Sequence, residues 1–308
     1  MPGFSAILFG KFRVERNDQL LDGLEAGKVQ ELLGYLLIHR ERPQPREFLS
    51  ETIWESQPPA KSKKYLRQTL WKLKSALREH IGGENPDLLI DPEWIQLDPS
   101  AGWRTDIAEF EQTYNGVKNK SSANLSSEDY RNMEKTVRLY HGGLLEGWYQ
   151  EWCILERERF EAMHLTFLNK LIQYCERHHL YEAGLAYGRQ LLSYDRAYEY
   201  AHRQMMRMFF QSGDRTQALR QFERCTAALH EELGVEPADR TRLLYQQIRA
   251  DKLEPDLPPP TDGAPGPGTL LLAQSIERLD RFAETMDRVQ IQFHEEILLI
   301  EKSLRASA

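Results

Sequence analysis

The chain has 308 residues, of which 41% are hydrophobic, and a formal net charge of −7. This length predicts about two domains, each with enough apolar side chains to form a packed core. A mean hydropathy of −0.61, together with the lack of a long apolar run and of a signal-peptide pattern, argues against a membrane protein and predicts a soluble, cytoplasmic one.

The residues that usually carry enzymatic or metal chemistry are not spaced for it. Cys153, Cys175 and Cys225 are odd in number and widely separated, which argues against a disulfide framework or a zinc knuckle and predicts buried thiols. The chain has no His-Glu-x-x-His pair, and it lacks the glycine motifs of dinucleotide sites, phosphate loops and acyl-transfer elbows. We therefore expect a protein that is not an enzyme and that holds neither a cofactor nor a metal.

An N-terminal sheet and two helices are predicted before residue 57. Residues 8–15 alternate in the manner of a strand and lead to a turn at Asn17 and Asp18, which predicts an antiparallel sheet. Apolar residues recur at helical spacing over residues 29–37, and this helix ends before Pro43, because proline disfavours helical backbone in the residue that precedes it. A second helix carries Phe48, Leu49, Ile53 and Trp54.

The segment from Gln57 to Arg78 is predicted to be a basic, amphipathic helix. Leu66, Leu70, Leu73 and Leu77 form one stripe at helical spacing. The segment contains no Asp or Glu although the whole chain is acidic, so its positive charge is local and indicates a polyanionic partner. A basic helix can also be merely a solvated surface. The side chains predicted to meet the polyanion are Lys61, Lys63, Lys64, Arg67, Gln68, Trp71, Lys72, Lys74 and Arg78.

A short β-hairpin is predicted after the basic helix. Residues 88–90 and 94–97 have the composition of strands, and they flank the turn-forming sequence Asp91-Pro92-Glu93. Three helices followed by a hairpin form a winged helix, whose third helix enters the major groove of DNA while the hairpin can lie along the neighbouring backbone. The basic segment occupies the position of that reading helix.

These residues resemble the winged-helix effector domain of OmpR-type response regulators, in the form that begins the SARP family of bacterial transcriptional activators. The resemblance is carried by the segments Ile7 to Val14, Glu47 to Trp54 and Lys64 to Arg78. The wing departs from the family, because Asp91-Pro92-Glu93-Trp94 stands where the family usually has a Gly-Tyr pair.

A second, helical region is predicted for residues 101–254. Val137 to Gly147 and Glu151 to Arg159 closely match the signature of the bacterial transcriptional activation domain that follows the winged helix in SARP proteins. Helices that begin near Tyr181 and Thr216 approximate the tetratricopeptide period of about 34 residues. Stacked helix pairs of this kind offer a concave groove to an extended partner.

One apolar cluster in this region allows two interpretations. Its residues could line a pocket for an apolar ligand, or they could pack between helices, as stripes at helical spacing usually do. We expect packing. The residues are Met205, Met206, Met208, Phe209 and Phe210.

The end of the chain is predicted to be a Pro/Gly linker, residues 255–268, followed by a coiled-coil helix, residues 269–308. An exposed apolar seam has to be covered, either by another copy or partner or by docking onto the helical domain, and the linker favours self-association. The seam consists of Leu272, Ile276, Leu279, Ala283, Met286, Gln290, Phe293, Ile297, Ile300 and Leu304. The residues expected to carry oligomerisation are Ile276, Leu279, Met286, Phe293, Ile297 and Ile300.

The sequence thus predicts a mainly α-helical protein, with a winged helix-turn-helix in residues 1–100 and a tetratricopeptide-like activation domain in residues 101–254. The resemblance, which extends from about Ile7 to Ile248, implies a transcriptional activator that binds double-stranded promoter DNA and contacts RNA polymerase. Lysine suits guanine, glutamine suits adenine and tryptophan can touch a thymine methyl group. Phosphates would be met by Lys63, Arg67, Lys74 and Arg78, and base edges by Lys61, Lys64, Gln68, Trp71 and Lys72. The alternative is a peptide-binding scaffold whose winged helix no longer binds DNA.

Overall fold

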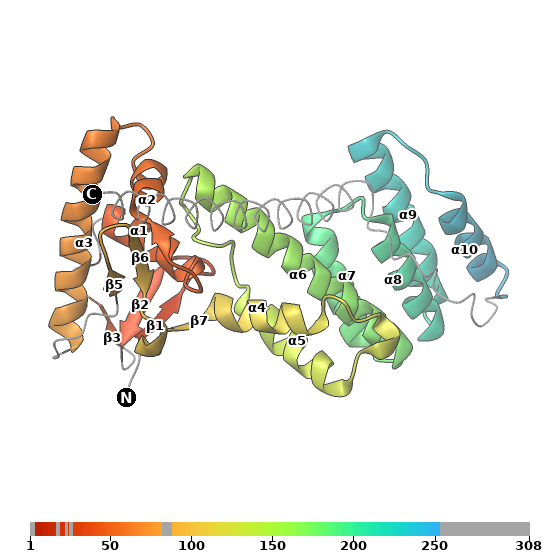
Figure 1. Ribbon diagram of the computed structural model, residues 1–308. Helices are drawn as coiled ribbons and strands as arrows, with labels where there is room; N and C mark the ends of the chain where they lie inside the picture. Colours follow the sequence, from red (N-terminus) through yellow and green to blue (C-terminus); the bar gives the residue numbers. More distant parts are fainter. Residues whose placement is uncertain (1–3, 17–18, 22–23, 25–26, 82–87, 253–308) are drawn as a thin grey trace, which may run out of the picture. The chain divides into compact units, whose positions relative to one another are not determined.

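The computed structural model describes residues 4–16, 19–21, 24, 27–81 and 88–252. The chain divides between Phe167 and Leu168, inside one long helix, into two compact units, which we call the first and second units. Figure 1 labels their helices and strands. The predicted turn at Asn17 and Asp18 and the predicted linker and coiled coil lie outside the described residues.

A four-stranded sheet opens the first unit. Strands β1 (Phe4–Ile7), β2 (Arg13–Arg16), β3 (Gln19–Leu20) and β7 (Arg104–Thr105) lie in the order β3-β2-β1-β7. Strand β2 is antiparallel to β1, with Ala6 opposite Val14. Strand β7 is parallel to β1, so the sheet is mixed and not purely antiparallel as predicted.

The predicted strand over residues 8–15 is wrong for residues 8–12, where the chain leaves the sheet and turns between β1 and β2. Gly10 has a φ of +78°, a conformation that glycine adopts without steric cost. The backbone N–H groups of Leu8 and Phe9 bond to the carboxylate of Asp106 and not to a neighbouring strand. Leu8, Phe9 and Phe12 are all buried although they follow no single face of a strand. Their burial arises from contacts that a local pattern does not contain.

The winged helix forms as predicted. Helices α1 (Gly27–Ile38), α2 (Arg46–Ile53) and α3 (Pro59–Ile81) are followed by the hairpin of β5 (Leu88–Ile90) and β6 (Trp94–Leu97). The short strand β4 (Gln44–Pro45) adds to this hairpin in the order β4-β6-β5. The buried leucine stripes meet in the core between the helices. They include Leu32, Leu33, Leu36 and Leu37 of α1, Leu49 of α2, and Leu66, Leu70, Leu73 and Leu77 of α3.

The first unit also contains the start of the helical region. Helix α4 (Asp106–Val117) begins directly after β7, and α5 (Ser127–Leu139) and α6 (Glu151–Arg177) follow, with single 3-10 turns at Pro99–Ala101 and Ser122–Asn124. Thr105 caps α4, since its hydroxyl accepts a hydrogen bond from the N–H of Ala108. An aromatic core joins this region to the N-terminal segment, because the Phe9 ring lies 4.9 Å from that of Phe110 and 5.5 Å from that of Phe160.

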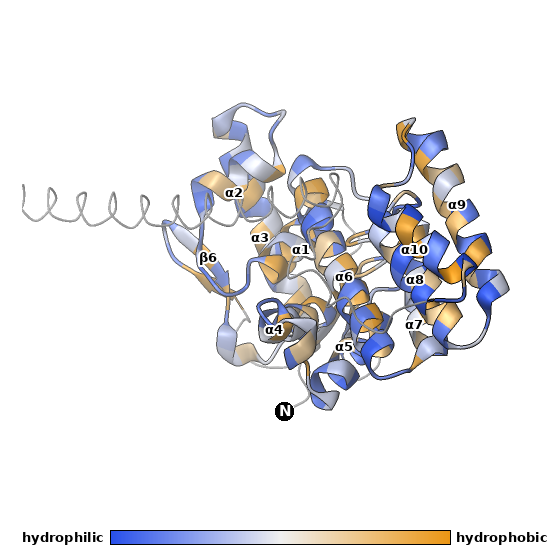
Figure 2. Ribbon diagram, turned by 90° about the vertical axis from the view of Figure 1, so that its right-hand side faces the viewer, coloured by the Kyte–Doolittle hydropathy of each residue, from blue (hydrophilic) through white to orange (hydrophobic). Residues whose placement is uncertain are grey.

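The second unit stacks helices in antiparallel pairs. The end of α6 is followed by α7 (Tyr181–Tyr194), α8 (Glu199–Gln211), α9 (Arg215–Leu233) and α10 (Asp239–Arg249). In Figure 2 these helices carry alternating polar and apolar bands, the pattern of helices with one buried side. Gly184 and Gly188 let α7 approach α8 closely, since a β-carbon there would lie within 2.7 Å of a methionine side chain of α8.

The apolar cluster of α8 is core, as expected. Met205, Met206 and Met208 are at most 2% exposed. Phe209 and Phe210 pack against a cluster of buried residues from α8, α9 and α10. The three cysteines are also fully buried. Among the described residues, no helix is both long and apolar enough to span a membrane.

Candidate nucleic-acid interface

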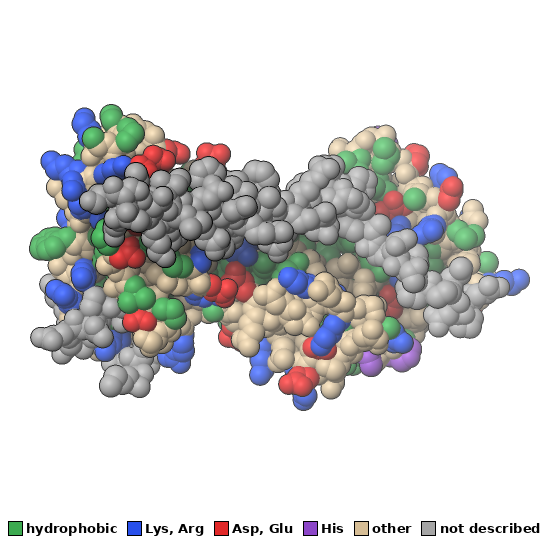
Figure 3. Space-filling view, in the orientation of Figure 1, with side chains coloured by type: hydrophobic (Ala, Val, Ile, Leu, Met, Phe, Trp, Pro, Cys, Tyr) green, Lys and Arg blue, Asp and Glu red, His purple; other side chains and the backbone are tan. Residues whose placement is uncertain are grey.

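Helix α3 presents a basic face to solvent, opposite its buried leucine stripe. Of the residues predicted to meet a polyanion, Lys74 is half-buried and the others are exposed. Trp71 stands out, because 70% of its side chain is exposed in the middle of this face. In Figure 3, Lys and Arg side chains gather over the part of the first unit that carries α3. The structure therefore brings all nine predicted residues together on one accessible helix.

Hydrogen bonds at its first turn position the start of α3. Pro58 precedes α3 and Pro59 is its first residue. The N–H groups of Lys61 and Ser62 bond to the carbonyl oxygen of Pro58. The buried hydroxyl of Ser62 donates within the same turn, at 3.3 Å to the carbonyl oxygen of Pro58. The Ser62 hydroxyl also lies 3.4 Å from the carbonyl oxygen of Trp54, directly after α2. This contact and the leucine stripe fix the rotation of the helix about its axis, and hence which side chains face outward.

One cation of this face is already paired. The Lys63 ammonium lies 2.6 Å from a carboxylate oxygen of Glu47 on α2. This hydrogen bond and charge contact lower the pKa of Glu47 and raise that of Lys63. Within the described part of the chain, no other cation of α3 forms an ion pair. The sequence could not reveal the pairing, because Glu47 lies on a different helix.

The wing is short and acidic at its turn. The Asp91 carboxylate accepts hydrogen bonds from the N–H groups of Glu93 and Trp94, at 2.8 and 2.6 Å. Arg46, at the start of α2, donates to the carbonyl oxygen of Asp91 at 3.1 Å. The side chains of Asp91 and Glu93 are exposed, and carboxylates repel phosphate groups. Positive charge for a polyanion is thus supplied by α3 and not by the wing turn.

A half-buried carboxylate ties the winged helix to the helical region, at a place that we call the junction. Asp106, the first residue of α4, accepts hydrogen bonds from the N–H groups of Leu8 and Phe9 at 2.8 to 3.0 Å. Burial raises its pKa, and these backbone donors oppose that rise by stabilising the charged form. Nearby, the N–H of Gly10 bonds to the carbonyl oxygen of Gly143 at 2.9 Å. The turn after β1 is therefore part of the junction.

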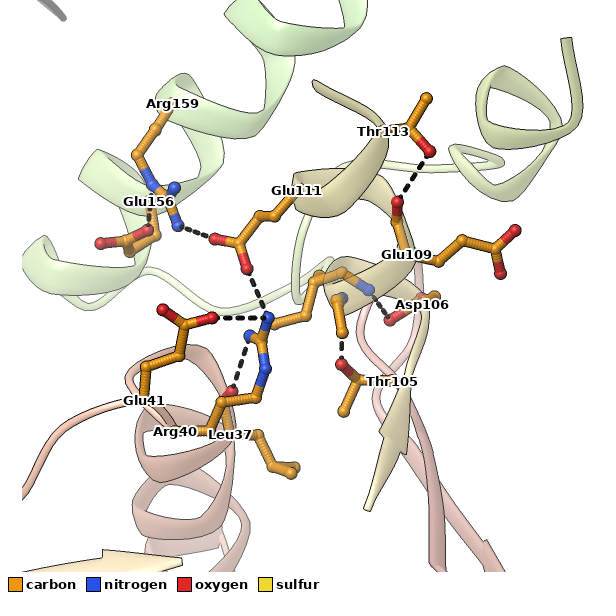
Figure 4. Close-up of polar contacts among 12 residues, drawn as sticks. Leu37, Arg40, Glu41, Thr105, Asp106, Glu109, Glu111, Thr113, Glu156 and Arg159 are labelled. Carbon is orange, nitrogen blue, oxygen red and sulfur yellow. Dashed lines mark hydrogen bonds and ion pairs between the residues drawn. The ribbon is translucent and has the colours of Figure 1, made fainter. Parts of the chain in front are cut away.

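A charge network makes a second connection at this junction (Figure 4). Glu111 of α4 lies between two arginines, 2.6 Å from Arg40, which follows α1, and 3.0 Å from Arg159 of α6. Arg159 also contacts Glu156 at 2.7 Å. The four side chains are only 17 to 25% exposed. Sequence reasoning missed this network, since its members lie 71 and 48 residues apart and no motif links them.

Two tryptophans before and within α6 make a third connection. The Trp148 ring lies against Gly34 of α1, where a β-carbon would be 3.3 Å from it, and 5.6 Å from the ring of Phe12. The Trp152 ring lies 5.2 Å from that of Tyr35 on α1. The winged helix and the start of the helical region are thus packed as one body within the first unit.

Comparison with known proteins agrees with this architecture. Residues 105–249 match the model of the bacterial transcriptional activator domain family. The transcriptional regulatory protein MoaR1 of Mycobacterium tuberculosis is 24% identical to this chain over 233 residues, which cover 72% of the chain and 71% of MoaR1, and MoaR1 of Mycobacterium bovis matches equally. Residues 105–249 are thus similar to a bacterial transcriptional activator domain, and most of the chain is similar to a transcriptional regulator.

A solved structure has a similar fold. Mycobacterium tuberculosis EmbR, in complex with a low-affinity phosphopeptide, matches this chain with a TM-score of 0.66 at 18% identity, over 91% of this chain and 72% of EmbR. The likeness to EmbR supports the order of a winged helix followed by a helical domain. The name of MoaR1 is that of a regulator and not that of an enzyme.

Proposed function

We propose that this chain is a SARP-type transcriptional activator that binds promoter DNA through α3 and contacts RNA polymerase through its helical domain. The observation that carries the proposal is the exposed face of α3, where cations surround Trp71 in a chain of net charge −7. A helix that is basic within an acidic protein attracts DNA locally, while the rest of the surface does not. The activity would be exerted in the cytoplasm.

The positions of the side chains on α3 support separate roles, in which some residues contact bases and others contact phosphates. Lys64, Gln68 and Trp71 project directly away from the leucine stripe, so they would reach base edges in a major groove. Lys63, Arg67, Lys74 and Arg78 lie toward one border of the face, where phosphates line the groove. Lys61 and Lys72 lie toward the opposite border.

The test is DNA binding by the full chain over a series of salt concentrations. Lys74→Ala should weaken binding to cognate and scrambled duplexes alike and make the slope of log affinity against log salt shallower by about one. Lys135→Ala, which removes an exposed lysine from α5, is the control and should leave the slope unchanged. If the parent chain binds no duplex at low salt, DNA binding is wrong and a peptide-binding scaffold becomes the better description.

The proposed domain limits are residues 1–100 for the DNA-binding domain and 101–254 for the activator domain, although the two compact units divide inside α6. The activating role is tested in transcription with purified RNA polymerase on a template that carries the bound site. Stimulation by the full chain is expected. Equal transcript yields with and without the protein would contradict it.

The C-terminal helix is proposed to join two copies of the chain. Pairing would raise DNA affinity by bringing two winged helices onto adjacent half-sites, through effective concentration and without new contacts. Ending the chain after Lys252 should then lower the mass measured by light scattering from that of an oligomer to that of a monomer. An unchanged mass across a concentration series would show that the tail does not associate.

A further inference from the structure

Large apolar side chains are exposed where α6 begins. Tyr149, in the loop before the helix, is 82% exposed, and Leu155 and Ile154 are 52% and 38% exposed. Glu151 and Glu158 are also exposed, one turn before and one turn after Leu155 on the same side of the helix. We call these five residues the α6 patch. Single exposed apolar residues are common, whereas a group with polar residues around it marks an interaction site.

Other side chains of the same segment pack inward, so the exposure of the patch is selective. Trp148 and Trp152 pack against α1, and Cys153 is fully buried. The Arg157 guanidinium donates to the carbonyl oxygens of Leu144, Leu145 and Trp148, at 2.7 to 3.0 Å. These bonds hold the loop that carries Tyr149 in place. A rigid apolar surface loses little conformational entropy when a partner binds it.

The charge of the patch selects the kind of partner. Within the described residues, Glu151 and Glu158 form no ion pair, so their negative charge is uncompensated. Half-buried Glu161, one turn further along, has a raised pKa because of burial and the nearby charge of Glu158. These carboxylates repel phosphates and attract cations. The patch is therefore unsuited to DNA and complementary to a protein surface with apolar side chains flanked by Lys or Arg.

We propose that the α6 patch is the surface through which this regulator binds RNA polymerase, at an element of the polymerase that presents apolar side chains among basic ones. This inference rests on the proposed function and names the contact site for it. The patch belongs to the same compact unit as α3, and Asp106, Glu111 and the two tryptophans connect them. A chain bound to DNA through α3 would thus hold the patch at a fixed position relative to its operator.

The experiment compares full-length double variants. Tyr149→Ser with Leu155→Ser should leave the melting temperature and the affinity for promoter DNA within about twofold of the parent, since exposed substitutions rarely unfold a protein. Binding to purified RNA polymerase holoenzyme and transcript yield should both fall about tenfold. The matched control is Tyr194→Ser with Leu243→Ser, which removes side chains that are 42% and 50% exposed in the second unit. The control should retain the parent's polymerase binding and transcript yield.

Charge reversal gives an independent measurement. Glu151→Lys with Glu158→Lys should also abolish polymerase binding while DNA binding is retained. If the parent stimulates transcription and the patch variants do so equally, this inference is overturned and the proposed activation stands. If the patch variants lower the mass found by light scattering, the patch joins copies of this chain and the inference is likewise overturned. A parent that binds DNA but neither binds nor stimulates the polymerase overturns the activating role and this inference together.

Discussion

Two charged regions of the first unit use similar residues in opposite ways. On α3, cations crowd one face and Lys63 alone has a carboxylate partner among the described residues. At the junction, Arg40 and Arg159 share Glu111 and are mostly removed from solvent. Charges that are paired and partly buried hold elements together, whereas charges that are left unpaired in water remain available to a ligand. Pairing, and not the abundance of Lys and Arg, separates the structural region from the candidate binding region.

The largest effect is expected from breaking the junction. Glu111→Ala would leave two partly buried arginines without their shared partner and should lower the free energy of unfolding by about 3 kcal/mol. All six tryptophans lie in the first unit, so urea unfolding followed by tryptophan fluorescence reports on this unit.

Glu134→Ala is the matched control for this prediction. Its pair with Arg138 on α5 is 33% and 74% exposed, and its loss should cost at most about 0.5 kcal/mol. Equal effects of the two substitutions would show that the junction network does not stabilise the fold.

A loss of stability of similar size is expected at acid pH, through a histidine that is buried beside the junction. His164 stacks on Tyr140 at 4.3 Å, and burial lowers its pKa from 6.5 to about 4. The unfolded chain then binds more protons between these values, so stability is complete above pH 6.5 and falls as the pH drops toward 4. The loss from this residue is about 3 kcal/mol.

His164→Phe keeps an aromatic ring between its neighbours and removes the titration. Plots of unfolding free energy against pH should therefore be flatter for this variant than for the parent. His230→Phe, at the exposed end of α9, is the control. Parallel plots for the parent and His164→Phe would mean that His164 does not set the acid sensitivity.

On the exposed face of α3, substitutions should change DNA binding and leave the stability of the fold intact. Lys64→Ala or Gln68→Ala should each cost about 1 to 3 kcal/mol on a cognate site and relax the preference at one base position. Leu70→Ala, by contrast, should destabilise the domain by about 2 to 5 kcal/mol through a core cavity. Titration of cognate and scrambled duplexes alongside melting curves separates these cases. Unchanged binding by folded Lys64→Ala and Gln68→Ala would show that α3 is not the reading helix.

The smallest effect is expected at the ion pair of Lys63 and Glu47. This pair is the place where the face of α3 resembles the junction, because its charge is paired. Glu47→Gln should free Lys63 for a phosphate and raise DNA affinity about twofold to threefold at low salt. Glu51→Gln removes the same charge from α2 without breaking this pair and should have a weaker effect. Identical affinities for the two variants would assign the gain to net charge alone.

The sequence predicted the face of α3 well and the junction hardly at all, for a physical reason. A helix links its buried and exposed sides by a fixed period, so the leucine stripe determined where Lys64 and Trp71 would point. No such period connects Asp106 to Leu8, which lies 98 residues away in the chain.

The error at Gly10 has the same origin. Residues 8–15 alternate like a strand, but Phe9 is buried by Phe110 of α4 and Phe160 of α6 and not by a continuous sheet. The family resemblance supplied the order of the domains, while the contacts between them required the fold.

The rigid junction has a consequence for promoter geometry. DNA turns once in about 10.5 base pairs. If α3 binds DNA and the α6 patch binds the polymerase as proposed, the packed junction holds the patch toward one side of the duplex only. Under the proposed function, operators for this protein should therefore share one helical phase relative to the promoter, at spacings that differ by whole turns. Inserting half a turn between operator and promoter would place the bound protein on the wrong side of the DNA, and inserting a full turn would bring it back.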